Sequence, residues 1–201
     1  MARQKPYVLL LSVGLVLLFG LTAYVMAKTY VAYSRQVGKM AVIRTALDNL
    51  TFCRPYELSS EGCYLSPTTM LTDGSGKKRP LPEIVSTHGR TLVYRFSRMN
   101  CMPCIAMHLK LLKSIIDDHA GTGLVILCDY QNARDLRILR NTYEISCELY
   151  SADRLGIPME DVNNPYFFIL TGDMRCEGFF TAFKETSRQT ENYLRALMRK
   201  L

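Results

Sequence analysis

The chain begins with a long run of apolar residues. Residues 7–27 (YVLLLSVGLVLLFGLTAYVMA) span 21 positions without a charge. At about 1.5 Å of rise per residue, a helix of this length crosses a hydrocarbon core of roughly 30 Å. The pattern therefore predicts a transmembrane helix. A cleaved signal peptide is the alternative, because Val25-Met26-Ala27 places small residues near a potential cleavage point.

The next two segments differ in pattern. Residues 28–50 lack proline and repeat apolar side chains at spacings of three and four, which predicts a helical stalk that continues the membrane helix. A helix packed on the domain or on the membrane surface would show the same pattern, and a dimeric coiled coil would need more heptads. Residues 51–89 are rich in Ser, Thr, Pro and Gly, which predicts irregular structure with one or two short strands.

Beyond residue 90 the pattern alternates between strands and helices. We expect strands at 91–96, 123–128, 166–170 and 175–180, and helices at 103–118, 133–143 and 190–201. Strands separated by helices imply right-handed crossovers and a central sheet with helices on both faces. The last two strands form a hairpin, so the sheet is mixed. The predicted organisation is an anchor at 1–27, a stalk at 28–50 and one α/β domain at 51–201.

The net charge of +7 lies mostly around the apolar run. Six of the 25 Lys and Arg residues precede the first acidic residue, Asp48, and from there onward 19 basic residues face 18 acidic ones. A nucleic-acid-binding domain would carry its excess of positive charge on the folded part, so we expect no nucleic-acid partner. Arg3 and Lys5 stand directly before the apolar run, which favours a cytoplasmic N-terminus and an exported C-terminal domain.

The strongest chemical signal is the motif Cys101-Met102-Pro103-Cys104. It lies where a predicted strand passes into a predicted helix, which is the context of a redox CxxC. Unpaired N–H groups and the positive end of the helix dipole stabilise a thiolate there. Cys101 is then the nucleophile, and Cys104, on the same helical face, is the resolving thiol. Pro103 suits an early helical position because its missing N–H would have no partner there.

Other uses of a CxxC pair are less well supported. Haem attachment needs His after the second cysteine, and that residue is Ile105. Structural zinc would need two more ligands, which His108, Cys53 and Cys63 can supply only if loops converge. His108 also fits an ordinary packing position on its helix. We therefore expect neither a metal nor a cofactor.

Five further cysteines are present, and an even pairing within the seven is impossible. Cys53 and Cys63 can form a structural disulfide or remain two free thiols. Cys128, at the end of an apolar strand, fits a small core residue. Cys147 can pair with Cys176 or serve as an accessory redox thiol. Seven cysteines in a chain of 201 residues are typical of an oxidising compartment.

The order of these features resembles the thioredoxin superfamily, in particular its TlpA/ResA-like branch of membrane-anchored extracytoplasmic redoxins. The resemblance covers residues 67–201, including the stretch 71–81, which resembles extra N-terminal strands. It implies that Cys101 and Cys104 cycle between dithiol and disulfide, with Met102 and Pro103 between them at the substrate-binding surface. It also implies that Pro165 is cis and that Asn164 offers backbone hydrogen bonds to a bound polypeptide.

The chain departs from that family at three positions. It has no Trp before the motif, and Arg95 occupies the place of the buried acid of thioredoxins. Arg98 occupies the place of the Thr that peroxiredoxins use, which disfavours peroxidase activity. The relay of protons to Cys104 is therefore unassigned.

The function expected from these features is thiol-disulfide exchange with exported proteins, supplied with electrons by a membrane or extracytoplasmic dithiol donor. The expected location is the bacterial cytoplasmic membrane, with a single pass and the domain in the periplasm. A non-enzymatic partner-binding or assembly module, supported by the missing Trp and acid, and a metal-delivery protein are the alternatives.

Overall fold

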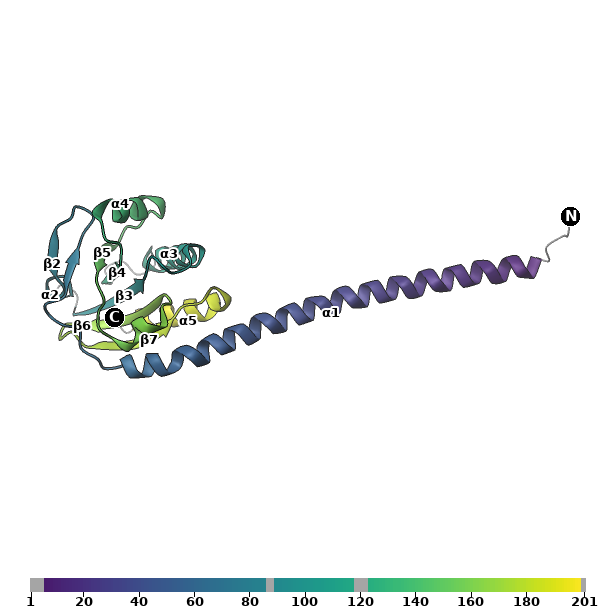
Figure 1. Cartoon of the computed structure of the whole chain (residues 1–201), viewed down its shortest axis with the longest axis horizontal. Helices are drawn as coiled ribbons and strands as arrows, with labels where there is room; N and C mark the ends of the chain where they lie inside the picture. Colours follow the sequence, from purple (N-terminus) through teal and green to yellow (C-terminus); the bar gives the residue numbers. More distant parts are fainter. Residues whose placement is uncertain (1–5, 86–88, 118–122, 200–201) are drawn as a thin grey trace. The chain divides into compact units, whose positions relative to one another are not determined.

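The computed structural model describes residues 6–85, 89–117 and 123–199 (Figure 1). Arg3 and Lys5 lie outside this part of the chain, as do residue 118 of the helix predicted at 103–118 and residues 200–201 of the helix predicted at 190–201. The chain divides into two compact units, residues 1–45 and residues 46–201.

The first unit consists of the greater part of a single helix. Helix α1 (Pro6–Ser60) is 55 residues long, and its N-terminal part is long and apolar enough to cross a membrane. The apolar side chains are open to the surroundings, with Leu10 73% and Phe19 76% exposed. A water-soluble surface rarely displays a continuous apolar band of this kind, so α1 is a candidate membrane span rather than a core helix.

The last turns of α1 belong to the second unit. The expectation of irregular structure is wrong for residues 51–60, because the helix continues through them to Ser60. Cys53, Glu57 and Ser60 are buried there, at spacings of four and three residues. This buried helical face explains why the helix continues beyond the predicted end of the stalk at residue 50.

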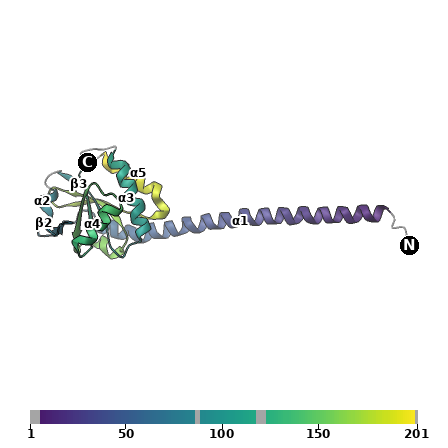
Figure 2. The ribbon, with the colours of Figure 1, turned by 90° about the horizontal axis from the view of Figure 1, so that it is seen from above.

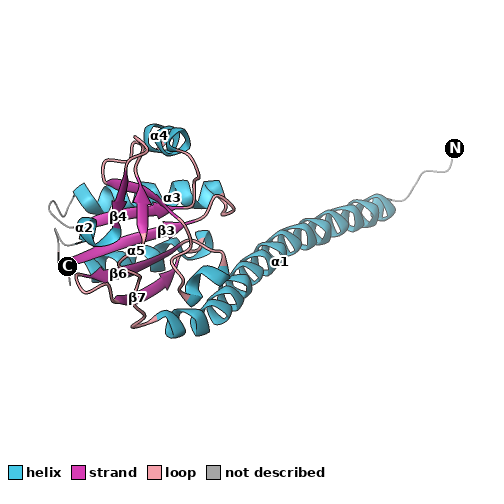
Figure 3. Ribbon diagram, turned by 60° about the vertical axis from the view of Figure 1, so that its left-hand side comes forward, coloured by secondary structure: helices cyan, strands magenta, loops and turns pink. Residues whose placement is uncertain are grey.

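The second unit is built on a seven-stranded mixed sheet with the order β2-β1-β5-β4-β3-β6-β7 (Figure 3). The strands are β1 (Met70–Thr72), β2 (Lys78–Pro80), β3 (Arg90–Phe96), β4 (Leu124–Cys128), β5 (Glu148–Ala152), β6 (Tyr166–Thr171) and β7 (Cys176–Thr181). Strands β3, β4 and β5 are parallel, and the remaining neighbours are antiparallel. The predicted mixed α/β sheet is confirmed. Strand β5 was not predicted.

Helices precede β3, connect the parallel strands and follow β7. They are α2 (Leu81–Val85), α3 (Met102–Asp117), α4 (Ala133–Thr142) and α5 (Ser187–Met198), with short 3-10 turns η1 (Pro158–Val162) and η2 (Lys184–Thr186). Helix α4 starts after Asn132, whose side chain accepts a hydrogen bond from the Asp135 amide at 2.8 Å and so caps the helix. Helices α3 and α5 lie side by side (Figures 1 and 2).

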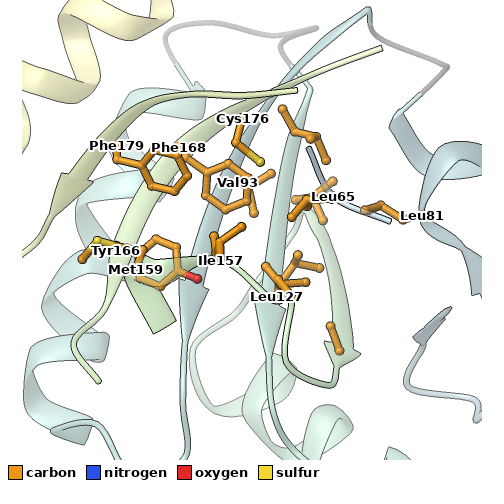
Figure 4. Packing of buried hydrophobic residues seen from close by; sticks show 14 of the residues in the cluster. Leu65, Leu81, Val93, Leu127, Ile157, Met159, Tyr166, Phe168, Cys176 and Phe179 are labelled. Carbon is orange, nitrogen blue, oxygen red and sulfur yellow. The ribbon is translucent and has the colours of Figure 1, made fainter. Parts of the chain in front are cut away.

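Two apolar clusters occupy the two faces of the sheet. Along β3, Leu92, Tyr94 and Phe96 belong to one cluster and Val93 belongs to the other, because successive side chains of a strand point to opposite faces. Helices α3, α4 and α5 cover the face of Tyr94. The other cluster, shown in Figure 4, includes Phe168 and Phe179, whose rings stack with centroids 5.2 Å apart.

Candidate active site

The CxxC motif lies at the junction between β3 and α3, as the sequence predicted. The Cys101 carbonyl accepts hydrogen bonds from the amides of Cys104 at 3.0 Å and Ile105 at 3.1 Å, so Cys101 is the residue immediately before the first helical turn. Its side chain is exposed, while Cys104 is partly buried one turn further on. The Cys101 sulfur therefore lies at the positive end of the helix, where negative charge is stabilised.

The two thiols have opposite electrostatic properties. Hydrogen bonds from the Cys104 side chain and backbone hold the pKa of Cys101 below its ordinary value. Burial, followed by the interaction with Cys101, raises the pKa of Cys104 to about 11. Near neutral pH a larger fraction of Cys101 than of Cys104 is therefore ionised.

Two charged side chains from the far end of the chain affect this pair. The charge of Lys184 in η2 lowers the pKa of both thiols, and that of Glu185 raises it. The two side chains lie 3.8 Å apart, and Lys184 is the more exposed of the two, at 64% against 20%. Sequence reasoning missed both residues, since about 80 positions separate them from the motif and no local pattern marks them.

A buried polar pair underlies the motif. The Tyr94 hydroxyl and His108 Nδ1 are 2.9 Å apart, and both residues are fully buried. Burial, followed by a negative charge on the neighbouring Cys104, raises the pKa of Tyr94. The His108 Nε2 atom is buried, and it has no hydrogen-bond partner among the residues that the structure describes. The spacing of four residues between Cys104 and His108 on one helix could have indicated this proximity, and it agrees with the packing position considered for His108.

Asn100 joins the motif to the loop before β6. Its side-chain nitrogen donates to the Asn163 carbonyl at 2.6 Å, and its side-chain oxygen accepts from the Ser97 amide at 2.7 Å. The predicted substrate-binding residues Asn164 and Pro165 directly follow Asn163, so this contact brings their loop beside the motif. Asn100 is a positioning residue that was not predicted from the sequence.

The resemblance implied a cis bond before Pro165, and this prediction is wrong. The bond between Asn164 and Pro165 is trans, which is the favoured isomer of an X–Pro bond. Asn163, two residues before Pro165, has a left-handed backbone with φ +53°, and the chain changes direction there. Pro165 is buried, and its carbonyl accepts a hydrogen bond from the Ala182 amide at 2.9 Å.

A hollow of about 180 Å³ opens beside Asn100 and Asn164. Its floor contains Arg95, which donates to the Ala152 carbonyl at 3.0 Å and forms an ion pair with Glu160 at 3.1 Å. Both side chains of the ion pair are 7% exposed. At the position where thioredoxins carry a buried acid, this chain therefore has Arg95, paired with Glu160. Cys101, Met102, Pro103 and Pro165 do not line this hollow, so the structure gathers only part of the predicted substrate-binding set there.

The remaining cysteines do not pair as considered from the sequence. All seven cysteines are thiols in the structure. Cys53 contacts Thr181 at the C-terminal end of β7. Cys63 lies beside Cys176 at the other end of this strand. At about 3.3 Å per strand residue, the two ends of β7 are about 16 Å apart. This separation excludes the Cys53–Cys63 disulfide.

The predicted alternative of a disulfide between Cys147 and Cys176 is wrong as well. Cys147 packs against the cluster under α3 and α4, and Cys176 belongs to the cluster on the opposite face of the sheet. Cys128 is fully buried, as expected of a core residue, and its thiol donates to the Tyr150 carbonyl at 3.5 Å. Among the described residues, no group of three or more His, Cys, Asp or Glu side chains is arranged to hold a metal ion.

Comparison with known proteins establishes the fold. No family model and no curated protein matches this chain. A candidate electron transfer protein of Aquifex aeolicus VF5 is similar to it with a TM-score of 0.53 and 14% identity, over 70% of this chain and 95% of its own. The peroxidoxin BcpB of Mycobacterium tuberculosis is similar with a TM-score of 0.53 and 14% identity, over 71% and 97% of the two chains. The expected thioredoxin-like fold is confirmed.

Proposed function

We propose that this chain, which has the thioredoxin-like fold, is a thiol-disulfide oxidoreductase with Cys101 as nucleophile and Cys104 as resolving thiol. One observation carries the proposal: an exposed thiol with a lowered pKa begins a helix, and a second thiol with a raised pKa lies one turn deeper. This arrangement separates the attacking role from the resolving role.

The reaction follows from that separation. The Cys101 thiolate attacks one sulfur of a substrate disulfide, and the other substrate sulfur leaves as a thiolate. Cys104 then loses its proton and attacks Cys101, which releases the second substrate thiol and leaves a Cys101–Cys104 disulfide. The substrate gains two electrons, and an external dithiol donor returns the pair to its reduced state.

Substrate binding is assigned to the surface around the motif. Met102 and Pro103 separate the two cysteines, and Asn164 and Pro165 follow the residue that Asn100 holds in place. The neighbouring hollow is lined by amide and charged groups, which suits contact with an extended polypeptide backbone. Position 98 holds Arg rather than Thr, so we do not extend the peroxidase activity implied by the name of the M. tuberculosis neighbour to this chain.

The proposed location follows from the sequence around α1. Residues 7–27 would anchor the chain in a bacterial cytoplasmic membrane, with the second unit in the periplasm and exported proteins as substrates. The exposed apolar surface of α1 and the basic residues Arg3 and Lys5 support this placement.

A partner-binding module without catalysis is the second candidate. It is favoured by the paired Arg95 at the position of the thioredoxin acid and by the trans bond at Pro165. In this case the fold would dock an exported protein, and the thiol pair would be incidental.

Reduction of insulin by dithiothreitol separates the two candidates. The full chain in detergent is expected to accelerate the reaction, and Cys101→Ser is expected to abolish the acceleration. Cys147→Ala is the matched control, because it removes a partly buried thiol elsewhere in the domain.

A second experiment traps the mixed disulfide between Cys101 and its substrate. With Cys104→Ala, a mixed disulfide formed at Cys101 can no longer be resolved from within the chain, so protein adducts are expected to accumulate on Cys101 and to be released by reductant. Wild-type protein that does not accelerate insulin reduction, together with a Cys101 titration like that of a free thiol, would favour the partner-binding module.

A further inference from the structure

Two cysteines outside the motif face each other across a short antiparallel pairing. The segment after α1 pairs with the start of β7, with Tyr64 opposite Arg175. The Cys176 amide donates to the Cys63 carbonyl at 2.8 Å, and the Gly62 amide donates to the Cys176 carbonyl at 2.8 Å. Gly62 has a left-handed φ of +78°, so Gly62 and Cys63 together oppose Cys176 in a glycine bulge.

The burial of the neighbouring residues shows where the two thiols point. Tyr64 is 65% exposed and Arg175 is exposed, whereas the next pair inward along the ladder, Leu65 and Met174, is buried. Because adjacent residues of an extended chain point to opposite sides, Cys63 and Cys176 both point toward the core.

Their surroundings agree with this direction. Cys176 is fully buried in the cluster of Figure 4, and the partly buried Cys63 packs against the same cluster. Burial, followed by a negative charge on the neighbouring Cys63, raises the pKa of Cys176.

The backbone geometry suits a covalent link. Opposed residues of a regular hydrogen-bonded antiparallel pair have Cα atoms about 5.5 Å apart, and in this bulge Cys63 shares the position opposite Cys176 with Gly62. Disulfides most often join Cα atoms separated by roughly 5.5 to 6 Å. The Cys63 thiol donates to the Ser59 carbonyl at 3.5 Å, a weak contact that a rotation about the Cα–Cβ bond would break.

We propose that Cys63 and Cys176 form a second dithiol, which an external disulfide oxidises to a structural bond between the end of α1 and β7. The Cys63 thiolate attacks the oxidant and expels one of its sulfurs as a thiolate. Cys176 then attacks the mixed disulfide and releases the second sulfur. The two cysteines lose two electrons and two protons, and the oxidant becomes two thiols. Cys63 reacts first because it is partly exposed, while Cys176 is buried.

The test uses the full chain in detergent, carrying Cys101→Ser and Cys104→Ser so that its outcome is independent of the proposed function. The protein is incubated with oxidised glutathione, remaining thiols are blocked with N-ethylmaleimide, and tryptic peptides are identified by mass spectrometry. The expected result is a peptide beginning at Cys176 that is linked to the peptide containing Cys63 and is released by reductant.

Single variants locate the link. Cys53 shares a tryptic peptide with Cys63, because the Arg54–Pro55 bond resists cleavage, so Cys53→Ala is the matched control. The link is expected to persist with Cys53→Ala and to be lost with Cys63→Ala. A glutathione adduct on Cys63 beside an unreacted Cys176 would overturn the proposal, as would a link from Cys176 to any other cysteine. Neither outcome requires substitution of the buried Cys176.

Discussion

At the scale of single residues, the reactivity of Cys101 depends on charges that come from η2. The Cys101 sulfur is exposed, so its alkylation rate reports the fraction of thiolate directly. Its pKa lies below the ordinary value, and hydrogen bonds from Cys104 are the main cause. Lys184 lowers it further, and Glu185 opposes Lys184.

Removing each of these two charges in turn is expected to shift the pKa of Cys101 in opposite directions. Lys184→Gln is expected to shift the pH midpoint of Cys101 alkylation upward and to slow alkylation at pH 7 by about two- to threefold, the range of an exposed charge pair. Glu185→Gln is expected to shift the midpoint downward. The measurement is the rate of iodoacetamide modification at Cys101 from pH 5 to pH 9. Equal midpoints in the two variants would contradict this assignment.

His108 makes the stability of the domain depend on pH. Burial lowers the pKa of His108 to about 4, whereas an unfolded chain has a value near 6.5. Between these values the unfolded state binds a proton that the folded state does not, so the contribution of His108 to stability falls as the pH drops from about 6.5 toward 4 and is constant above about 6.5. The loss is on the order of 3 kcal/mol over the full window.

The measurement is the free energy of unfolding in urea for wild type and for His108→Gln between pH 7.5 and pH 4.5. The variant removes the titrating group, so its stability is expected to fall less steeply with acid than that of wild type. Identical slopes for the two proteins would show that the histidine does not titrate as described.

At the scale of elements, the end of α1 caps an edge strand with carboxylates. Glu57 accepts hydrogen bonds from the Thr181 amide at 2.8 Å and the Thr181 hydroxyl at 2.9 Å. Glu61, one turn later, accepts from the Gly178 amide at 2.9 Å. Strand β7 is the last strand of the sheet, so these contacts satisfy N–H groups that would otherwise be unpaired at the edge.

The two glutamates are expected to differ in their contribution to stability. Glu57 is 8% exposed and Thr181 is fully buried, so Glu57→Ala leaves two buried donors without an acceptor and is expected to cost about 2 to 3 kcal/mol. Glu61→Ala is the matched control: Glu61 is exposed, water can replace it, and the cost is expected to stay below about 1 kcal/mol. Equal free energies of unfolding for the two variants would contradict the capping role of Glu57.

At the scale of the whole molecule, the boundary between the two compact units falls inside a helix. The second unit begins at Ala46 and includes the turns of α1 that bury Cys53, Glu57 and Ser60. The Ser60 hydroxyl also accepts a hydrogen bond from the Met159 amide at 2.8 Å, which ties the helix end to η1.

Two fragments test this boundary. Residues 46–201 are expected to unfold cooperatively and to stay in solution without detergent, because this fragment keeps the packed end of α1 and omits the apolar run. Residues 61–201 expose the surface that α1 covers, and their thermal midpoint is expected to be lower by several degrees, at about 4 °C or less per kcal/mol for a domain of this size. Thermal unfolding followed by circular dichroism measures both. Equal midpoints would show that the end of α1 is not part of the folded domain.

Features that are encoded locally are predictable from the amino-acid sequence. The helix at 103–118, the apolar strands around it and the position of the CxxC motif at a helix start all follow from side-chain periodicity within a window of about ten residues. The structure places α3 at Met102–Asp117, so the helix starts one residue before the predicted start, and residue 118 lies outside the described part of the chain. The apolar run at 7–27 is equally local, and the structure makes it part of α1.

Contacts between distant residues, in contrast, depend on how the whole chain folds. Cys63 faces Cys176, and Lys184 acts on Cys101, because strand pairing and chain reversal bring together segments that lie about 80 to 110 positions apart. Residues 51–60 are helical because Glu57 packs against Thr181 of β7 and accepts a hydrogen bond from its amide. No local sequence pattern specifies this contact. Local periodicity sets the type of each element, but the neighbours of a side chain depend on the order of the strands, and that order belongs to the whole chain.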